Sequence, residues 1–226
     1  MSTQQRPIPA VATLLCALLV LAGCATPRGD TTEWDGLVRT PGTGFNAVFV
    51  KPDAEIPGYR NILLKPVQVH FARNWEPNRG GRSTLGRLDA ADIAAIQTNL
   101  ATMAEEIFRE ELAAGGYQLV AEPGPDTFIV IPAIVDLYIT APDTMAAGRT
   151  RTYTANSGRM TLVLELRDSI TGEILARAVD ARSARGTGTM TITNRVTNTA
   201  DARRAIRAWA RAMRNALASL YKGAAS

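Results

Sequence analysis

Few residues of this chain have side chains that could act in catalysis or hold a metal ion. His70 is the only histidine, and histidine is a frequent general base and metal ligand. Neighbouring positions supply no two further ligands at helical spacing, and the alternation of His70 with Val69 and Phe71 indicates the mixed face of a strand. The sequence also lacks a Gly-x-Ser-x-Gly motif, so we expect neither a metal centre nor Ser-His hydrolysis.

Paired carboxylates are the other chemistry to consider, because two acids can act as general acid and base. Asp136 and Asp180 are the best candidates, since each interrupts an apolar strand pattern. A structural ion pair with Arg167, Arg177 or Arg182 would explain the same pattern without catalysis. We favour the ion pair, and we expect a protein that is not an enzyme and that needs no cofactor.

Three arginines near the C-terminus recur every four residues, at Arg203, Arg207 and Arg211. On a helix they share one face and repel one another by a few tenths of a kcal/mol per pair. An acidic partner or anionic lipid headgroups would relieve this repulsion. A partner-binding surface and an ordinary solvated face are therefore the two interpretations of these residues.

Two long polar loops hold a second group of candidate binding residues. Loops on a rigid scaffold often carry binding function, and arginine beside tryptophan or tyrosine is common at the centre of protein interfaces. The alternative is that both loops are solvated connections. The predicted binding residues in these loops are Trp75, Arg149, Arg151 and Tyr153.

The N-terminus has the composition of an export signal. Arg6 is the only charged residue before Cys24, and residues 11–21 form an apolar run interrupted only by Thr13 and Cys16. A basic start, a short apolar middle and small residues after it are typical of a secretory signal. The run is shorter than the roughly twenty apolar residues of a membrane-spanning helix. We therefore predict a signal peptide over residues 1–23.

The end of this signal, Leu21-Ala22-Gly23-Cys24, resembles the lipobox of bacterial lipoproteins. That resemblance implies cleavage before Cys24, a lipid on its thiol and acylation of the new amine. Ala25 follows, where an Asp would resemble an inner-membrane retention signal. The resemblance therefore implies a lipid anchor in the outer membrane, with the domain on the periplasmic side.

Cysteine and charge limit the domain further. Cys16 leaves with the signal and Cys24 carries the lipid, and the chain has no other cysteine. The folded domain is therefore expected to lack a disulfide and a thiol nucleophile. The net charge of +4 is modest, and a periplasmic protein meets no chromosomal DNA, so we expect no nucleic-acid partner.

Two amphipathic helices are predicted. The first begins at Asp89, which with Asp92 resembles a capping box, and ends at Gly115-Gly116. The second covers residues 198–221. The predicted apolar stripes consist of Ile93, Ile96, Leu100, Met103 and Ile107, and of Ile206, Trp209, Met213, Leu217 and Leu220. The residues expected on the solvated face of the first helix are Glu105, Glu106, Glu110 and Glu111.

The strands are predicted from alternation of apolar and polar residues. Residues 127–140 form the longest, apolar on both sides at its start and therefore central in its sheet. The hairpin partners are residues 160–167 and 173–183, joined by a turn at residues 168–172. Three further strands are expected at residues 46–50, 61–71 and 117–121.

The order of the predicted strands and helices along the chain predicts one α/β (α+β) domain. In it, a single mixed or antiparallel sheet has both helices packed on one face. The domain is expected over residues 46–222. Residues 24–45, which contain prolines and glycines and few apolar residues, are predicted to be a flexible tether.

Short motifs along the domain resemble a known family. They include residues 48–54, 57–64, 67–69 and 74–75, and later residues 165–169, 171–173 and 179–180. Together they are similar to a Gram-negative lipoprotein family of unknown function, number 3313 in the series of domains of unknown function. The resemblance spans most of residues 46–221 and implies an envelope lipoprotein, but it implies no catalytic residue and no ligand.

The leading hypothesis is a periplasmic interaction domain, anchored in the outer membrane, that acts on an envelope protein in assembly or transport. The rival hypothesis is an accessory module that binds a small ligand or a lipid, which would require an apolar cavity between the helices and the sheet.

Overall fold

The computed structural model describes residues 33–41, 44–52, 54, 59–78, 87–139, 152–154, 156–185, 191–193 and 195–223. The chain divides into two units, Met1–Thr31 and Thr32–Ser226, and every described residue belongs to the second. Cys24, Arg149 and Arg151 lie outside the described residues, as does the predicted signal peptide.

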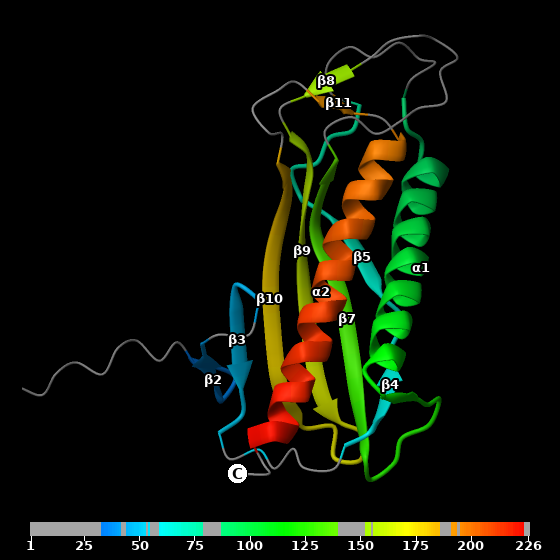
Figure 1. The fold of residues 1–226 in the computed structure, drawn as a ribbon. Coiled ribbons are helices and arrows are strands. Elements are labelled where there is room, and N and C mark those ends of the chain that lie inside the picture. Colours follow the sequence, from blue (N-terminus) through cyan, green and yellow to red (C-terminus); the bar gives the residue numbers. More distant parts are fainter. Residues whose placement is uncertain are drawn as a thin grey trace, which may run out of the picture. The chain divides into compact units, whose positions relative to one another are not determined.

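A nine-stranded mixed sheet forms one layer of this unit (Figure 1). Its strand order is β1-β2-β3-β10-β9-β7-β4-β6, and β5 pairs with β7 beyond the end of β4. The pairs of β4 with β6 and of β4 and β5 with β7 are parallel, and the others are antiparallel. The strands are β1 (Glu33–Trp34), β2 (Leu37–Thr40), β3 (Ala47–Val50), β4 (Asn61–Leu64), β5 (Gln68–Phe71), β6 (Gln118–Leu119), β7 (Thr127–Ile139), β9 (Asn156–Asp168) and β10 (Ile174–Arg185).

Two helices form the second layer, and both lie on the same face of the sheet (Figure 1). They are α1 (Ala90–Ala114) and α2 (Arg195–Gly223). Both begin at the end of the unit where a small second sheet pairs β8 (Thr152–Thr154) with β11 (Thr191–Thr193). The predicted fold class, a mixed sheet with both helices on one face, is confirmed.

Helix α1 begins where the sequence predicts. The Asp89 side chain accepts a hydrogen bond from the Asp92 amide at 2.8 Å, and the Asp92 side chain accepts one from the Asp89 amide at 3.1 Å. This capping box satisfies two amides that would otherwise lack partners at the helix start. At the other end Gly116 adopts a φ of 83°, which favours glycine, and the chain leaves the helix there.

The core lies between the helices and the sheet. Trp209 and Ile206 of α2, Phe108 of α1, and Phe128 and Ile134 of β7 are fully buried there. Large rings from three elements thus fill one layer, and burial of each such side chain contributes about 2 kcal/mol. The other face of the sheet is covered by neither helix (Figure 1).

The strand predicted over residues 61–71 is two strands, and the physical reason is Pro66. β4 ends at Leu64, opposite Val130, and β5 resumes at Gln68, opposite Ala133. Between these pairs, three residues on one side (65–67) face two on the other (131–132), as in a bulge. Proline has no amide hydrogen for the ladder, and the Val67 amide donates to Glu105 of α1 at 2.9 Å instead. Glu105 is therefore half-buried.

The tether predicted over residues 24–45 is too long, because its second half is folded. β1 and β2 form a hairpin, and β2 extends the sheet by pairing with β3. Leu37 is 1% exposed. The two strands have only two and four residues, which is too short to show a periodic pattern. The prolines and glycines nearby favour the prediction of a tether instead. Within the described part of the chain, no helix is long and apolar enough to cross a membrane.

Candidate functional site

The arginines predicted to bind a partner already have acidic neighbours within the chain. The Arg207 guanidinium lies 3.5 Å from the Glu110 carboxylate of α1. Arg211 and Arg214 both pair with Glu111, at 3.1 and 2.7 Å. The repulsion expected among the arginines of α2 is therefore relieved by carboxylates of α1. Glu111, which was expected on a solvated face, is buried between the two helices.

Arg203, one turn before Arg207, differs from the other two. It is exposed, and no ion pair joins it to another described side chain. Arg204 beside it pairs with Asp201 on the same helix.

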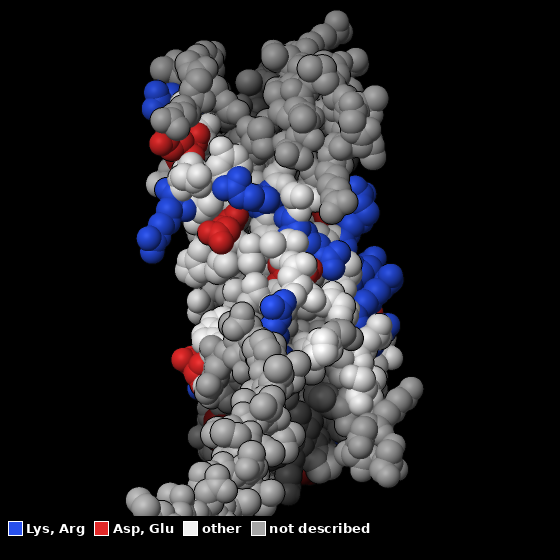
Figure 2. Space-filling model, turned by 90° about the vertical axis from the view of Figure 1, so that its left-hand side faces the viewer, with Lys and Arg blue, Asp and Glu red and all other residues white. Residues whose placement is uncertain are grey.

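Figure 2 views the side of the unit on which β2, β3 and β10 lie, and it shows basic side chains gathered across the middle with a few carboxylates between them.

Trp75 is held by the protein's own residues. Its indole N–H donates to the Ile139 carbonyl at 3.0 Å, and its ring stacks on Phe71 with 3.8 Å between centroids. Trp75 is half-buried. These contacts tie the segment after β5 to the end of β7, which gives Trp75 a structural role; its role in partner binding stays a prediction.

Tyr153 lies in β8, opposite Ile192 of β11. Figure 1 places this small sheet at the end of the unit where both helices begin and β7 ends. The segment of Trp75 reaches the same end through its bond to Ile139. The structure therefore brings the backbone of Tyr153 and the side chain of Trp75 to one end, whereas Arg207 and Arg211 pair along the two helices.

The two candidate acids, Asp136 and Asp180, are not brought side by side. They lie on β7 and β10, and β9 runs between these strands. Asp136 is exposed, with a φ of 52°, at a bulge between Val135 and Tyr138. The structure therefore gives no support to a pair formed by these two carboxylates.

Asp180 is instead a buried structural acceptor, 4% exposed. Its carboxylate accepts hydrogen bonds from the Trp209 indole at 2.7 Å, from the Asn46 amide at 2.9 Å and from Arg182 at 2.8 Å. Asp180 thus connects α2, β10 and the segment before β3. The predicted ion pair with Arg182 is confirmed.

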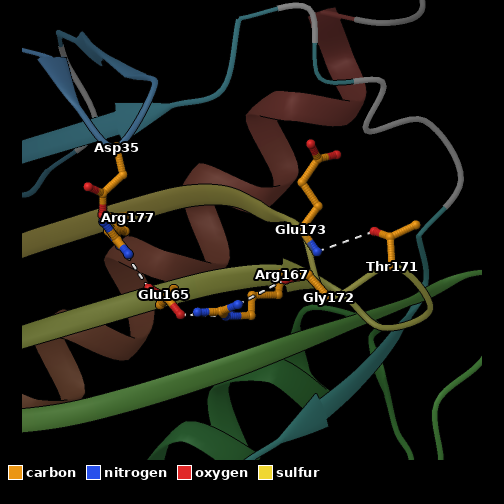
Figure 3. A network of polar contacts seen from close by, with 7 residues as sticks. All are labelled: Asp35, Glu165, Arg167, Thr171, Gly172, Glu173 and Arg177. Atoms are coloured by element: carbon orange, nitrogen blue, oxygen red, sulfur yellow. Dashed lines mark hydrogen bonds and ion pairs between the residues drawn. The ribbon is translucent and has the colours of Figure 1, made fainter.

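A second polar network lies on the sheet face that the helices do not cover (Figure 3). Glu165 of β9 accepts hydrogen bonds from Arg177 of β10, at 2.7 Å, and from Arg167. Arg177 also pairs with Asp35, in the turn between β1 and β2. Burial acts to raise the pKa of Glu165, but the two arginines outweigh it and the pKa is lowered. Sequence reasoning missed Asp35 because it had been assigned to the tether.

The turn between β9 and β10 is held by Asp168. Its carboxylate accepts hydrogen bonds from the Thr171 amide at 2.6 Å and from the Tyr59 hydroxyl at 2.6 Å. The Thr171 amide, followed by the Tyr59 hydroxyl, lowers the pKa of Asp168 from 3.8 to about 2. Burial, together with the hydrogen bond to Asp168, raises the pKa of Tyr59 to about 12. Tyr59 stacks on Phe128.

His70 is exposed on β5, as its alternation predicts. Among the residues that the structure describes, no group of three or more His, Cys, Asp or Glu side chains is placed to hold a metal ion. Exposed guanidinium groups on the described surface can donate hydrogen bonds to carboxylates or phosphates.

The solved structures that this chain matches come from several bacteria. A minor lipoprotein from Acinetobacter baumannii has a TM-score of 0.37 and 12% identity, over 71% of this chain and 92% of that one. The PelC dodecamer from Paraburkholderia phytofirmans has a TM-score of 0.36 and 10% identity, over 74% and 94%. A Xanthomonas campestris protein assigned to DUF330 has a TM-score of 0.33 and 14% identity, over 73% and 86%.

No curated protein matches this chain significantly. The family model described as a protein of unknown function, DUF3313, matches residues 29–213. The match begins close to β1, ends within α2 and covers most of the chain, as the motifs in the sequence predict. The chain therefore belongs to the DUF3313 family.

Proposed function

We propose that this protein is a lipoprotein of the outer membrane, anchored through Cys24, and that its periplasmic domain is a non-enzymatic interaction module for an envelope assembly or transport partner. The observation that carries the address is the N-terminal pattern, in which a basic start and a short apolar run lead to Leu21-Ala22-Gly23-Cys24. Several acyl chains on one cysteine would hold the domain durably at a membrane.

The charged surface of α2 supports an interaction role for the domain. Arg211 remains 59% exposed although it pairs with Glu111. A guanidinium has five N–H donors in a fixed fork, so one carboxylate leaves donors available to a partner. Because Glu111 restricts the side chain before binding, less conformational entropy is lost when a partner arrives. Arg203 adds a charge with no ion-pair partner among the described side chains.

The experiment that tests the address is mass spectrometry of the protein purified from membranes of a Gram-negative host. We expect a mature chain that begins at Cys24 and carries acyl groups, found in the outer-membrane fraction. A Cys24→Ser variant should lose both the lipid and the membrane location. A wild-type chain without acyl groups would contradict the proposal.

The experiment that tests the partner is crosslinking in living cells, followed by pull-down of the anchored protein. Arg203→Glu should reduce the yield of one envelope protein, because it reverses an exposed charge without breaking an internal ion pair. Arg109→Glu, at an exposed position of α1, is the matched control and should leave the yield unchanged. An unchanged yield with Arg203→Glu would remove this helix surface from the proposal.

The rival function, binding of a small ligand or lipid, needs space between the helices and the sheet. Trp209, Phe108 and Phe128 occupy part of that layer and are fully buried. Native mass spectrometry of the protein distinguishes the two functions. A lipid retained in the folded domain, with no envelope protein in the pull-down, would make the accessory module the better account.

A further inference from the structure

The hairpin of β1 and β2 presents an aromatic ring to solvent at the point where the described chain begins. Trp34 and Ile170 are the only large hydrophobic residues that are exposed among the described ones, and Trp34 is 36% exposed. One edge of the indole is fixed, because it packs at 89° to the Phe49 ring with 5.4 Å between centroids. The Arg177 guanidinium lies 4.7 Å from the Trp34 ring centre. Trp34 is therefore a rigid ring that is partly open to solvent.

The covalent chain keeps this ring close to the proposed anchor. Ten residue steps separate Cys24 from Trp34, and a fully extended chain of that length spans at most about 35 Å. If residues 24–45 were all flexible, the domain could stand much farther from the membrane. Because β1 begins at Glu33, the hairpin is the described part of the domain with the shortest covalent connection to Cys24.

We infer that the β1–β2 hairpin docks on the surface of the membrane that holds the Cys24 lipid, with Trp34 at the level of the headgroups. This inference rests on the proposed lipid anchor. Tryptophan is enriched at membrane–water interfaces because its ring is apolar and its N–H is polar. The exposed Arg39 of the same hairpin would meet anionic headgroups favourably.

The described charges around the ring balance, because Arg39 and Arg177 match Asp35 and Glu165. The carboxylate of Asp35 would repel anionic lipids, but it pairs with Arg177, which also pairs with Glu165 (Figure 3). A single tryptophan binds a bilayer weakly. The covalent connection to the proposed anchor compensates, because linking two binding groups raises their effective concentration. Docking therefore orients the domain and is not needed to retain it.

The test uses the full lipidated protein in vesicles of phosphatidylethanolamine and phosphatidylglycerol, with and without bromine on the acyl carbons nearest the headgroups. Bromine quenches tryptophan emission over short distances. The emission of Trp34 is the difference between the wild-type protein and Trp34→Phe, a change that keeps a ring on Phe49. Trp75→Phe is the matched control, since Trp75 is held between Phe71 and Ile139.

We expect brominated lipid to abolish the difference between wild type and Trp34→Phe while the difference between wild type and Trp75→Phe persists. Vesicle flotation, measured on the same samples, separates the two proposals. Protein that floats with vesicles but keeps its Trp34 emission would overturn the docking inference and leave the anchor intact. Protein that does not float would overturn the lipid anchor, and the docking inference with it.

Discussion

At the scale of single residues, the best-placed acids in this domain serve the fold. The Asp180 carboxylate accepts hydrogen bonds from an indole, a backbone amide and a guanidinium. Removal of such a buried acceptor leaves these donors without partners. Asp168 holds the turn between β9 and β10 with one carboxylate oxygen and accepts from the Tyr59 hydroxyl with the other. The donors to Asp168 stabilise its charged form and so lower its pKa.

Asp168 makes the domain sensitive to acid. Its pKa in the folded protein is about 2, against an ordinary value of 3.8. Since the folded pKa is the lower one, the stabilisation is fully present above about pH 4 and is lost as the pH falls from 4 through 2. A shift of this size corresponds to about 2 kcal/mol. Urea unfolding at a series of pH values measures the free energy of unfolding that is lost.

The matched variant for this prediction is Asp168→Asn, which cannot lose a proton. It should be less stable than the wild type near neutral pH and should lose less stability between pH 4 and 2. Tyr59→Phe, which removes one donor to Asp168, should show an intermediate slope. Identical slopes for the wild type and Asp168→Asn would show that Asp168 does not cause the acid sensitivity.

At the scale of secondary-structure elements, the two helices are joined by charge as well as by apolar packing. Glu111 of α1 is buried and pairs with two arginines of α2, whereas the adjacent Glu110 is exposed and has one distant partner, Arg207. An exposed ion pair contributes little to stability, but breaking a buried one leaves charges without compensation.

The adjacent acids therefore provide a matched pair of variants. Glu111→Gln should lower the free energy of unfolding by about 2 kcal/mol, because two guanidinium groups lose their shared carboxylate. Glu110→Gln should change it by less than about 0.5 kcal/mol. Chemical denaturation followed by circular dichroism measures both. Equal effects of the two variants would contradict a specific role for Glu111.

At the scale of the whole molecule, the folded unit begins earlier than the residue composition indicates. The β1–β2 hairpin extends the sheet at one edge, and its Asp35 joins the polar network of the uncovered face (Figure 3). The hairpin also buries Leu37. The β1–β2 hairpin therefore forms one edge of the sheet and contributes to its uncovered face. It also connects the folded unit to the proposed anchor.

Two truncated chains test where the folded unit begins. Deletion of residues 1–32 should leave the free energy of unfolding unchanged, because it removes no strand. Deletion of residues 1–40 should lower it by about 3 kcal/mol, since it exposes the surface that buries Leu37 and removes Asp35, one of the two partners of Arg177. Urea unfolding of both chains measures the difference. Equal free energies of unfolding for the two truncated chains would show that residues 33–40 do not stabilise the folded unit.

The sequence by itself determined the elements whose signals are local and repeated. The capping box at Asp89, the glycines at 115–116 and the alternation along β7, β9 and β10 each lie within one element. Such patterns reflect the geometry of a single helix or strand, so they require no knowledge of distant residues. The mixed sheet with two helices on one face, and the family, followed from them.

Only the tertiary structure decided which charges have partners. Arg211 and Glu111 are 100 positions apart, and Asp180 and Asn46 are 134 positions apart. No periodicity of the sequence relates the members of either pair. The same holds for β1 and β2, because β3 supplies hydrogen bonds to β2 and β2 supplies them to β1. Short elements and long-range ion pairs depend on the packing of the whole chain, which local patterns do not encode.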